Sequence, residues 1–256
     1  MNILKKIPST VYLLLIVVSL QTFASLLPGI ILIEQKVAFS FGLFVFIIYL
    51  LWSQIFEYMM THPDFVNHTF PLKVFSVKFA ISMIMIITIS NAFTYQYGLI
   101  LLSYEVFHFL LFSDQFNYQE SFLYFLMNAL FKGIVFNLII SISYPYNFQL
   151  LYFQPYIFST LMILTGSLLL KLIRQNQHTL KKSDFLYLVP TFIGTALFLI
   201  TKNIQKELNI SLTIIMIGLF LIATLLAFYW KQKNNTLAQI VVIASVIINL
   251  ALFYFN

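Results

Sequence analysis

Long apolar runs separated by short polar connectors dominate this chain. Nine stretches are continuously apolar over roughly 20 residues, the length that an α-helix needs to cross a bilayer. They are 11–33, 38–60, 74–93, 97–113, 121–143, 150–172, 185–202, 210–230 and 237–255. Apolar and polar positions do not alternate with period two, so the runs predict helices rather than the strands of a membrane barrel. The expected fold is therefore all-α: a single integral membrane domain over residues 1–256, a polytopic bundle of about nine spans (range six to nine) without a soluble domain.

Composition supports a membrane location. Hydrophobic residues make up 61% of the 256 residues and charged residues 9%, whereas soluble domains are about half apolar and about a quarter charged. The chain contains no cysteine, which excludes disulfides, thiolate metal sites and cysteine nucleophiles. No two glycines stand four residues apart. We therefore expect the helices to pack through large interdigitated side chains, with occasional Ser, Thr and Ala.

The basic residues favour one orientation, because Lys and Arg accumulate in cytoplasmic loops. With nine spans and a cytoplasmic N-terminus, ten of the 14 basic residues lie inside: Lys5, Lys6, Lys73, Lys78, Lys171, Arg174, Lys181, Lys182, Lys231 and Lys233. Three lie outside: Lys36, Lys202 and Lys206. The net charge of +6 thus reflects membrane topology, and no nucleic-acid partner is expected. The expected location is the cell membrane, with 174–184 as a second basic cytoplasmic loop.

The connector 61–73 is a candidate cytoplasmic coupling segment. It reads T-H-P-D-F-V-N-H-T-F-P-L-K, and its prolines disfavour one long helix but permit a short one after Pro63. Phe65 and Phe70 would give such a helix an apolar face for a cytoplasmic partner. The alternative is an ordinary polar turn at the lipid headgroups. His62, Asp64 and His68 match no compact metal site, so no metal is predicted.

Few polar side chains lie within the apolar runs, and each is costly in lipid. Glu105 and His108 stand three residues apart on one helical face of the weak span 97–113, and Lys132 lies midway along 121–143. Lys132 needs an acidic partner, and Glu105 is the expected one. Two interpretations remain open: a buried cluster that fixes helix register, or a polar patch that lines a substrate or proton path. We expect Glu57 and Lys78 to form a second, structural pair.

Known catalytic patterns are missing. Glu105-x-x-His108 matches half of a carboxylate di-iron site, but the second half is absent. No Asp-rich pair suited to magnesium-diphosphate chemistry, H-E-x-x-H motif or phosphate-binding glycine loop occurs. The sequence therefore predicts no catalytic residue, no metal ligand and no cofactor in this chain.

One segment resembles a known family. The run Thr69-Phe70-Pro71-Leu72-Lys73-Val74-Phe75-Ser76-Val77-Lys78-Phe79 is similar to the turn of ABC-2-type transporter permeases that leads into a Lys at the head of the third helix. The resemblance implies that the preceding loop docks an ABC ATPase subunit, which would bind ATP and Mg²⁺, and that Lys78 anchors the next helix. The implied docking residues are His62, Pro63, Asp64, Phe65, Phe70, Pro71, Leu72 and Lys73.

The family usually has six spans and a longer amphipathic N-terminal helix. Small export and immunity permeases of Gram-positive bacteria are similarly short, apolar and rich in Phe and Ile, which implies a bacterial plasma membrane. Such a permease would work as a homodimer or with a paralogous permease, surrounded by membrane lipid.

Three functions remain open at the level of sequence. The first is the permease subunit of an ABC exporter that moves hydrophobic or amphipathic cargo, such as peptides or lipids. The second is a membrane-embedded lipid-modifying enzyme with Glu105, His108 and His62 as acid–base groups. The third is a non-transporting accessory or immunity protein that binds another membrane protein.

Overall fold

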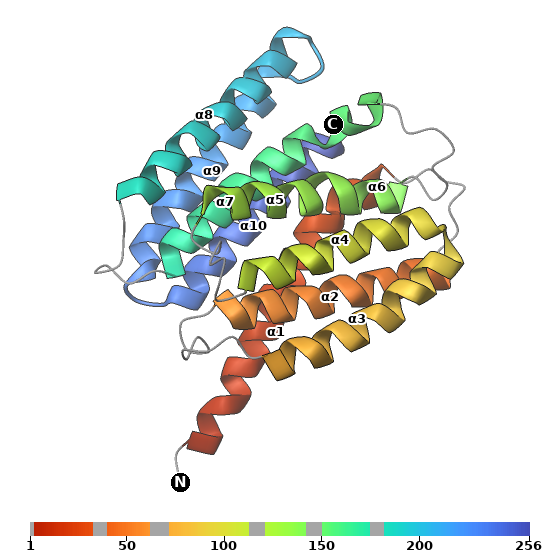
Figure 1. Cartoon of the computed structure of the whole chain (residues 1–256). Coiled ribbons are helices and arrows are strands. Elements are labelled where there is room, and N and C mark those ends of the chain that lie inside the picture. Colours follow the sequence, from red (N-terminus) through yellow and green to blue (C-terminus); the bar gives the residue numbers. More distant parts are fainter. Residues whose placement is uncertain (1–2, 33–39, 62–71, 113–120, 142–149, 175–181) are drawn as a thin grey trace.

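The computed structural model describes residues 3–32, 40–61, 72–112, 121–141, 150–174 and 182–256 (Figure 1). These ranges contain helices and no β-strand. The helices are α1 (Ile3–Ile31), α2 (Phe41–Thr61), α3 (Leu72–Ala92), α4 (Tyr95–Phe112), α5 (Phe122–Leu130), the π-helix η2 (Phe131–Val135), α6 (Phe136–Ser141), the 3₁₀-helix η3 (Leu150–Tyr156), α7 (Ile157–Arg174), α8 (Lys182–Ile204), α9 (Ile210–Lys231) and α10 (Asn235–Tyr254).

The predicted all-α membrane bundle is confirmed, and the chain is a multi-pass membrane protein. In the described ranges seven helices are long and apolar enough to cross a membrane. They are Phe41–Met60, Lys73–Ala92, Phe122–Ser141, Phe153–Arg174, Leu186–Ile204, Ile210–Lys231 and Asn235–Tyr254. The other two predicted spans correspond to α1, with its apolar part Leu15–Ile31, and to α4, whose 18 residues extend about 27 Å.

Polar residues in the connectors define where several helices begin and end. The Ser121 hydroxyl accepts a hydrogen bond from the Tyr124 N–H at 3.3 Å, and the Asn234 side chain accepts one from the Leu237 N–H at 3.1 Å. These are N-caps, which satisfy otherwise unpaired N–H groups of the first turn. At the end of α8, Lys206 adopts φ 60°, a left-handed conformation that reverses the chain toward α9.

Two groups of helices lie on either side of a central pair, which consists of α1 and the span formed by α5, η2 and α6 (Figure 1). α2, α3 and α4 lie side by side in one group, and α7 to α10 form the other. The N-terminal α1 packs against α2 of the first group, against α10 and α7 of the second, and against α6. The consecutive pieces α5, η2 and α6 form one interrupted span that packs mainly against α7 and α1. Residues of this central pair therefore face both groups.

Three apolar clusters fill the spaces between the helices. The first, around Phe158, lies among α1 and α7 to α10. The second contains Phe46 and Phe136, whose rings meet edge to face with centroids 5.9 Å apart. The third contains Phe56 and Phe75, also 5.9 Å apart, and joins α2 and α3 to α5 and α7. Because lipid tails are as apolar as these side chains, close packing rather than the hydrophobic effect holds the helices together.

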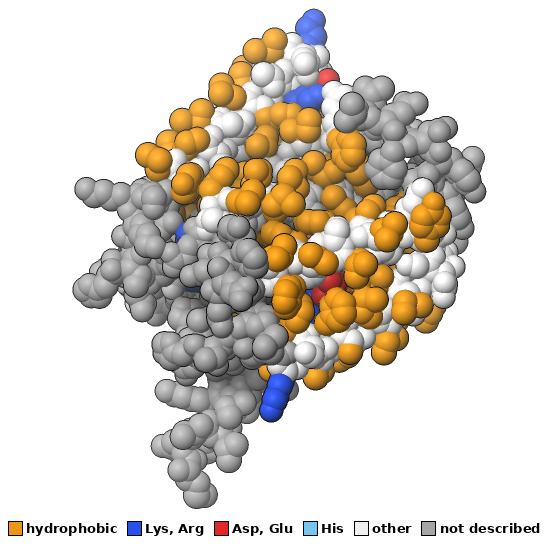
Figure 2. Space-filling view, in the orientation of Figure 1, with side chains coloured by type: hydrophobic (Ala, Val, Ile, Leu, Met, Phe, Trp, Pro, Cys, Tyr) orange, Lys and Arg blue, Asp and Glu red, His pale blue; other side chains and the backbone are white. Residues whose placement is uncertain are grey.

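The outward faces of the helices are apolar as well. On α8 six exposed aliphatic side chains recur every three or four residues: Leu186, Val189, Ile193, Leu197, Ile200 and Ile204. This spacing places them on one side of the helix. Figure 2 shows hydrophobic side chains over most of the visible described surface. Such a surface suits contact with hydrocarbon, while the charged side chains of Glu57, Lys78, Glu105 and Lys132 are turned inward.

Candidate functional site

Two buried ion pairs occupy the interior of the bundle. The Lys132 Nζ atom lies 2.7 Å from Glu57 Oε2 and joins η2 to α2. Lys78 pairs with Glu105 and joins α3 to α4. All four side chains are buried. A buried charge without a partner is strongly unfavourable, so each lysine makes the burial of its carboxylate possible.

The Glu57 carboxylate is held by three side chains of a single helical face. Tyr124 Oη donates to Oε1 at 2.6 Å, Asn128 Nδ2 donates to Oε1 at 2.7 Å, and Lys132 donates to Oε2. Tyr124, Asn128 and Lys132 follow one another every four residues, which places them on the same side of α5 and the start of η2. Lys132 Nζ also donates to Gln54 Oε1 at 3.1 Å, so α2 supplies two acceptors to one ammonium.

The Glu105 carboxylate has a different environment. Tyr49 Oη donates to Glu105 Oε1 at 2.9 Å, and Lys78 donates to Oε2. Lys78 Nζ lies 3.4 Å from His108 Nδ1. Because an ammonium group has no acceptor, Nδ1 must be the unprotonated nitrogen in this contact, and the proton of a neutral imidazole is on Nε2. The His108 ring stacks at a tilt on Tyr104, with ring centroids 4.2 Å apart.

The two pairs belong to one electrostatic cluster. α2 contributes Tyr49 to the Lys78–Glu105 pair and Glu57 to the Lys132 pair, two turns further along the helix. Glu57 also interacts electrostatically with Lys78. The two lysines and two carboxylates balance one another when both pairs are ionised, and the buried Arg174 also interacts electrostatically with Glu57 and Lys132.

The span that carries Lys132 is interrupted by the π-helix Phe131–Val135. The wider turn is accompanied by side-chain hydrogen bonds to its carbonyl groups: Asn137 Nδ2 lies 2.9 Å from Lys132 O and 3.0 Å from Gly133 O. Ser159 of α7 donates to Gly133 O at 2.7 Å. A π-helical turn inside an α-helix is frequently found at functional sites.

Asn137 also connects this span to α1. Its Oδ1 accepts from the Gly29 N–H at 2.7 Å, and its Nδ2 lies 2.8 Å from the Ser25 carbonyl. Residues 25 and 29 are hydrogen-bond partners in a regular α-helix. The side-chain amide of Asn137 therefore contacts both the N–H of Gly29 and the C=O of Ser25, the two groups that would pair with each other in this turn of α1, next to Pro28.

Single glycines allow the closest helix contacts. A Cβ atom at Gly133 would lie 2.5 Å from Thr160 Cα, and one at Gly29 would lie 2.9 Å from Asn137 Cα. Both distances are too short for two carbon atoms, so any larger residue would push the helices apart. The expectation that the helices pack through large side chains with occasional Ser, Thr and Ala left out these glycines. It rested on the absence of glycines spaced four residues apart, whereas a single glycine opposite a neighbouring backbone also allows a close contact.

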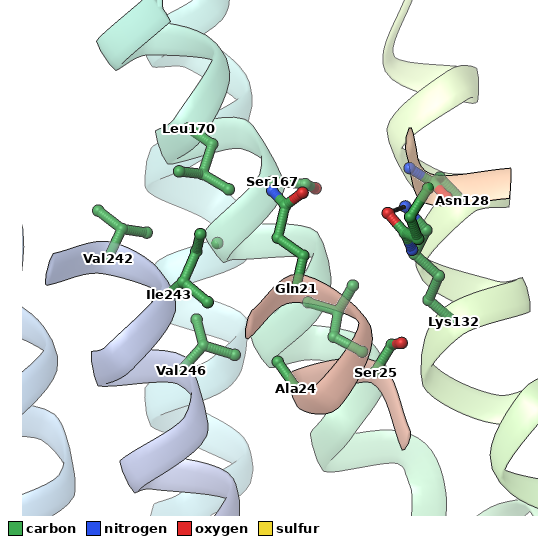
Figure 3. Close-up of a pocket in the computed structure, with 13 residues that line it drawn as sticks. Gln21, Ala24, Ser25, Asn128, Lys132, Ser167, Leu170, Val242, Ile243 and Val246 are labelled. Carbon is green, nitrogen blue, oxygen red and sulfur yellow. Dashed lines mark hydrogen bonds between the residues drawn. The ribbon is translucent and has the colours of Figure 1, made fainter. Parts of the chain in front are cut away.

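A partly open cavity of about 60 Å³ lies beside Lys132, between the two groups of helices. Gln54, Asn128, Lys132 and Ser25 form its polar wall. Leu170 of α7 and three residues of α10 form the apolar wall: Val242, Ile243 and Val246. Figure 3 shows Asn128 and Lys132 on one side, the α10 residues on the opposite side and α1 between them. The half-buried lining residues, Gln21, Ile163 and Ser167, mark the side on which the cavity opens.

Asn128 lines this cavity, and its side chain has an unpaired acceptor. Its Nδ2 group donates to Glu57 and lies 3.4 Å from Tyr124 Oη, so the amide cannot be turned around without placing Oδ1 against the carboxylate. Oδ1 is buried and has no hydrogen-bond partner among the described residues. A buried acceptor without a partner costs about 1–3 kcal/mol, which a donor in the cavity would recover.

The structure brings the predicted polar residues of the spans together, but it pairs them differently from the prediction. Glu105, His108 and Lys132 all lie in the buried cluster. The expected pairings of Lys132 with Glu105 and of Glu57 with Lys78 were both wrong, since Lys132 pairs with Glu57 and Lys78 with Glu105. Helix packing decides these partners: α3 contacts α4, whereas η2 lies beside the part of α2 that carries Glu57.

Most of the candidate docking residues lie outside the described ranges. These are His62, Pro63, Asp64, Phe65, Phe70 and Pro71. Leu72 is the first residue of α3, and the Lys73 side chain is exposed next to it. The described residues include no group of three or more His, Asp or Glu side chains close enough to hold a metal ion.

Sequence reasoning missed Tyr49, Gln54, Tyr124 and Asn128. A pattern that could have found them exists, because Tyr124, Asn128 and Lys132 repeat every four residues in an apolar run, as Tyr49, Ser53 and Glu57 do. Polar residues at this spacing share one helical face. The chain matches no protein-family model, no curated protein and no solved structure.

Proposed function

We propose that the chain is the permease subunit of an ABC exporter in a bacterial plasma membrane, with its N-terminus in the cytoplasm. It moves hydrophobic or amphipathic cargo, such as peptides or lipids, and a separate ATPase subunit binds and hydrolyses ATP with Mg²⁺. The observation that carries the proposal is the cavity with one polar and one apolar wall between the two groups of helices. A cavity of this kind can accept an amphipathic molecule within the thickness of the membrane.

The position of the ion pairs supports a route from the docking segment to the cavity. α2 ends at Thr61 and α3 begins at Leu72, so both helices flank the proposed docking segment 61–73. Glu57 lies four residues before the end of α2, and Lys78 lies six residues after the start of α3. A displacement of the segment by the ATPase therefore acts on one member of each buried pair. Glu57 transmits it to Lys132, which lines the cavity.

The proposed mechanism is alternating access. Closure of the ATPase around nucleotide moves the docking segment, and the two groups of helices then shift relative to one another around α1 and the interrupted span. The Glu57–Lys132 and Lys78–Glu105 pairs would have one stable arrangement in the inward-open state and another in the outward-open state. Cargo would leave on the outer side when the cavity opens there.

The alternative of a lipid-modifying enzyme has less support. Its proposed acid–base groups Glu105 and His108 are each 0% exposed, and neither lines the cavity. This alternative predicts turnover by the purified chain alone, without ATP. The accessory or immunity alternative predicts neither turnover nor a stable ATPase partner.

Docking is tested by exchanging the apolar and proline residues of the segment. Replacing Pro63, Phe65 and Phe70 with Ser in the tagged chain should abolish co-purification of a nucleotide-binding subunit from native membranes. The bundle itself should remain inserted and elute as the wild type does in size-exclusion chromatography. Lys206→Ala, in the connector after α8, is the matched control and should retain the subunit. Unchanged co-purification by the triple variant would reject the docking assignment.

A further inference from the structure

Asn128 and Lys132 both line the cavity, and between them they carry an unpaired hydrogen-bond acceptor and an ammonium donor. Both side chains are fixed on the same carboxylate, Asn128 through Oε1 and Lys132 through Oε2 of Glu57. The amide of Asn128 is 4% exposed, and its Oδ1 has no partner among the described residues. An ammonium has three N–H donors; Glu57 and Gln54 accept from two of those of Lys132, so the third is left for a further acceptor.

Charge restricts the ligand that can use these groups. The Lys132 ammonium is paired with Glu57 at 2.7 Å, so the charge of this lining residue is balanced by the carboxylate behind it. A bare anion or cation entering the cavity would lose its hydration without gaining an opposite charge. A hydroxyl group is neutral and is both a donor and an acceptor, so it can satisfy Asn128 Oδ1 and Lys132 Nζ at once.

The volume of the cavity and its apolar wall restrict the part of the ligand beyond the hydroxyl group. About 60 Å³ is less than half of the roughly 150 Å³ of an apolar cavity that binds benzene, so only a head group and its first carbons fit. Val242, Val246 and Leu170 face that volume from the apolar side. A hydrocarbon chain attached to the head must leave through the opening beside Gln21 and Ser167.

We propose that this cavity binds the hydroxyl head of a neutral amphipathic alcohol, with the hydroxyl donating to Asn128 Oδ1 and accepting from Lys132 Nζ. The apolar wall of α7 and α10 contacts the first carbons of its chain. Assigning this alcohol as cargo rests on the proposed exporter function, whereas the binding site itself needs no ATPase.

Photolabelling of the full-length chain in native membrane vesicles, without ATP, tests the site. An octanol that carries a diazirine serves as the probe, and mass spectrometry locates the labelled residues. Label is expected on α1, α7 and α10 near Gln21, Leu170 and Val246. Unlabelled 1-octanol should compete, while octanoate and octylammonium should compete at least about tenfold more weakly, since one good hydrogen bond corresponds to about that factor.

Matched variants distinguish this site from general partitioning into lipid. Asn128→Leu should weaken competition by octanol about tenfold. Asn249→Leu, which removes another buried amide whose described bond is to Ser245 of its own helix, should not. Gly166→Leu should fill the cavity and abolish the label. Gly218→Leu, where a Cβ atom meets nothing within 4 Å, should leave it unchanged.

The outcomes distinguish specific binding of the alcohol from occupation of the cavity by water and from partitioning of the probe into lipid. Thermal unfolding and size-exclusion profiles report folding of each variant, and Ala24→Leu is the second cavity-filling variant. Competition by monooleoylglycerol added to the vesicles identifies a lipid source, and competition by octanol alone identifies a smaller cargo; either supports the site. Equal label on α8 and α9, or unchanged competition in folded Asn128→Leu, would show that water alone serves Asn128 and would overturn the proposal. ATPase association is measured separately, so its failure cannot be confused with this result.

Discussion

Lys132 and Glu57 form an ion pair of 2.7 Å although 75 residues separate them in sequence. The pair fixes the π-helical part of one span against the end of α2, and its carboxylate accepts from Tyr124 and Asn128 as well. Both charged groups are buried, so removal of one leaves the other as a buried charge without its ion-pair partner. The pair therefore links the interrupted span to the helix that leads into the proposed docking segment.

Removal of one partner should be more harmful than removal of both. We expect Lys132→Met to destabilise the protein by about 3–5 kcal/mol, because it leaves Glu57 as an unpaired buried charge. Adding Glu57→Leu should restore most of that loss, since a buried pair can be replaced by apolar side chains at little cost. Free energies of unfolding measured in bicelles by steric trapping provide the comparison.

The same experiment distinguishes the partners. Glu105→Leu should not rescue Lys132→Met, because Glu105 pairs with Lys78. Lys202→Met is the control with a solvated partner. Lys202, 13% exposed, also lies 2.7 Å from its carboxylate, but Glu207 is 56% exposed, so the expected effect is below about 1 kcal/mol. Rescue by Glu105→Leu and not by Glu57→Leu would show that the pairs are exchanged.

Gly133 should tolerate no side chain. We expect Gly133→Ala to destabilise the bundle by about 1–3 kcal/mol, because its Cβ atom would overlap the backbone of Thr160. Gly218→Ala adds the same atom at an open position, and there the change should be neutral or stabilising by up to about 1 kcal/mol. Thermal unfolding of the two variants in one detergent gives the contrast, and equal midpoints would contradict the close approach of η2 and α7.

Much of the fold follows from the sequence, because the requirement for apolar helices in lipid is strict. All nine predicted spans coincide with helical segments, and Glu105, His108 and Lys132 stand out because charged residues are rare there. The ion-pair partners of these charged residues could not be predicted in the same way. Sequence proximity favoured Glu105 for Lys132, whereas the order of helices around α1 decides which side chains meet, and no local pattern encodes that order.

The contacts of Asn137 show the same limit. Its amide reaches Gly29, 108 residues away, and the nearby π-turn depends on one extra residue per turn that sequence periodicity does not reveal. The spacing of Tyr124, Asn128 and Lys132 was readable as a polar face, but its partner on α2 was not. Residues 62–71 lie outside the described ranges, so the docking segment remains a prediction from sequence.

Asn137 should be required for the contact between α1 and the interrupted span. Asn137→Leu removes its hydrogen bonds to both helices, and we expect a loss of about 1–3 kcal/mol because buried backbone groups lose a partner. Asn249→Leu is the matched change of a buried Asn whose described hydrogen bond lies within its own helix, and it should cost less. Stability of Asn137→Leu equal to that of Asn249→Leu would contradict this role.

The absence of cysteine makes the topology directly measurable. With nine spans, Lys73→Cys in intact cells should be protected from a membrane-impermeant maleimide, and Lys206→Cys should react. In inside-out vesicles the reactivity should reverse. Reaction of both positions from the same side would contradict nine spans, and reversal of both would contradict a cytoplasmic N-terminus.

The most direct test of the proposed function is native mass spectrometry of the tagged wild-type chain, extracted from its own membrane in a mild detergent. The exporter proposal predicts a complex in which this chain and a nucleotide-binding subunit occur in a fixed ratio, with two copies of the latter. A chain that is recovered alone, or with partners that bind no nucleotide, would contradict the proposal.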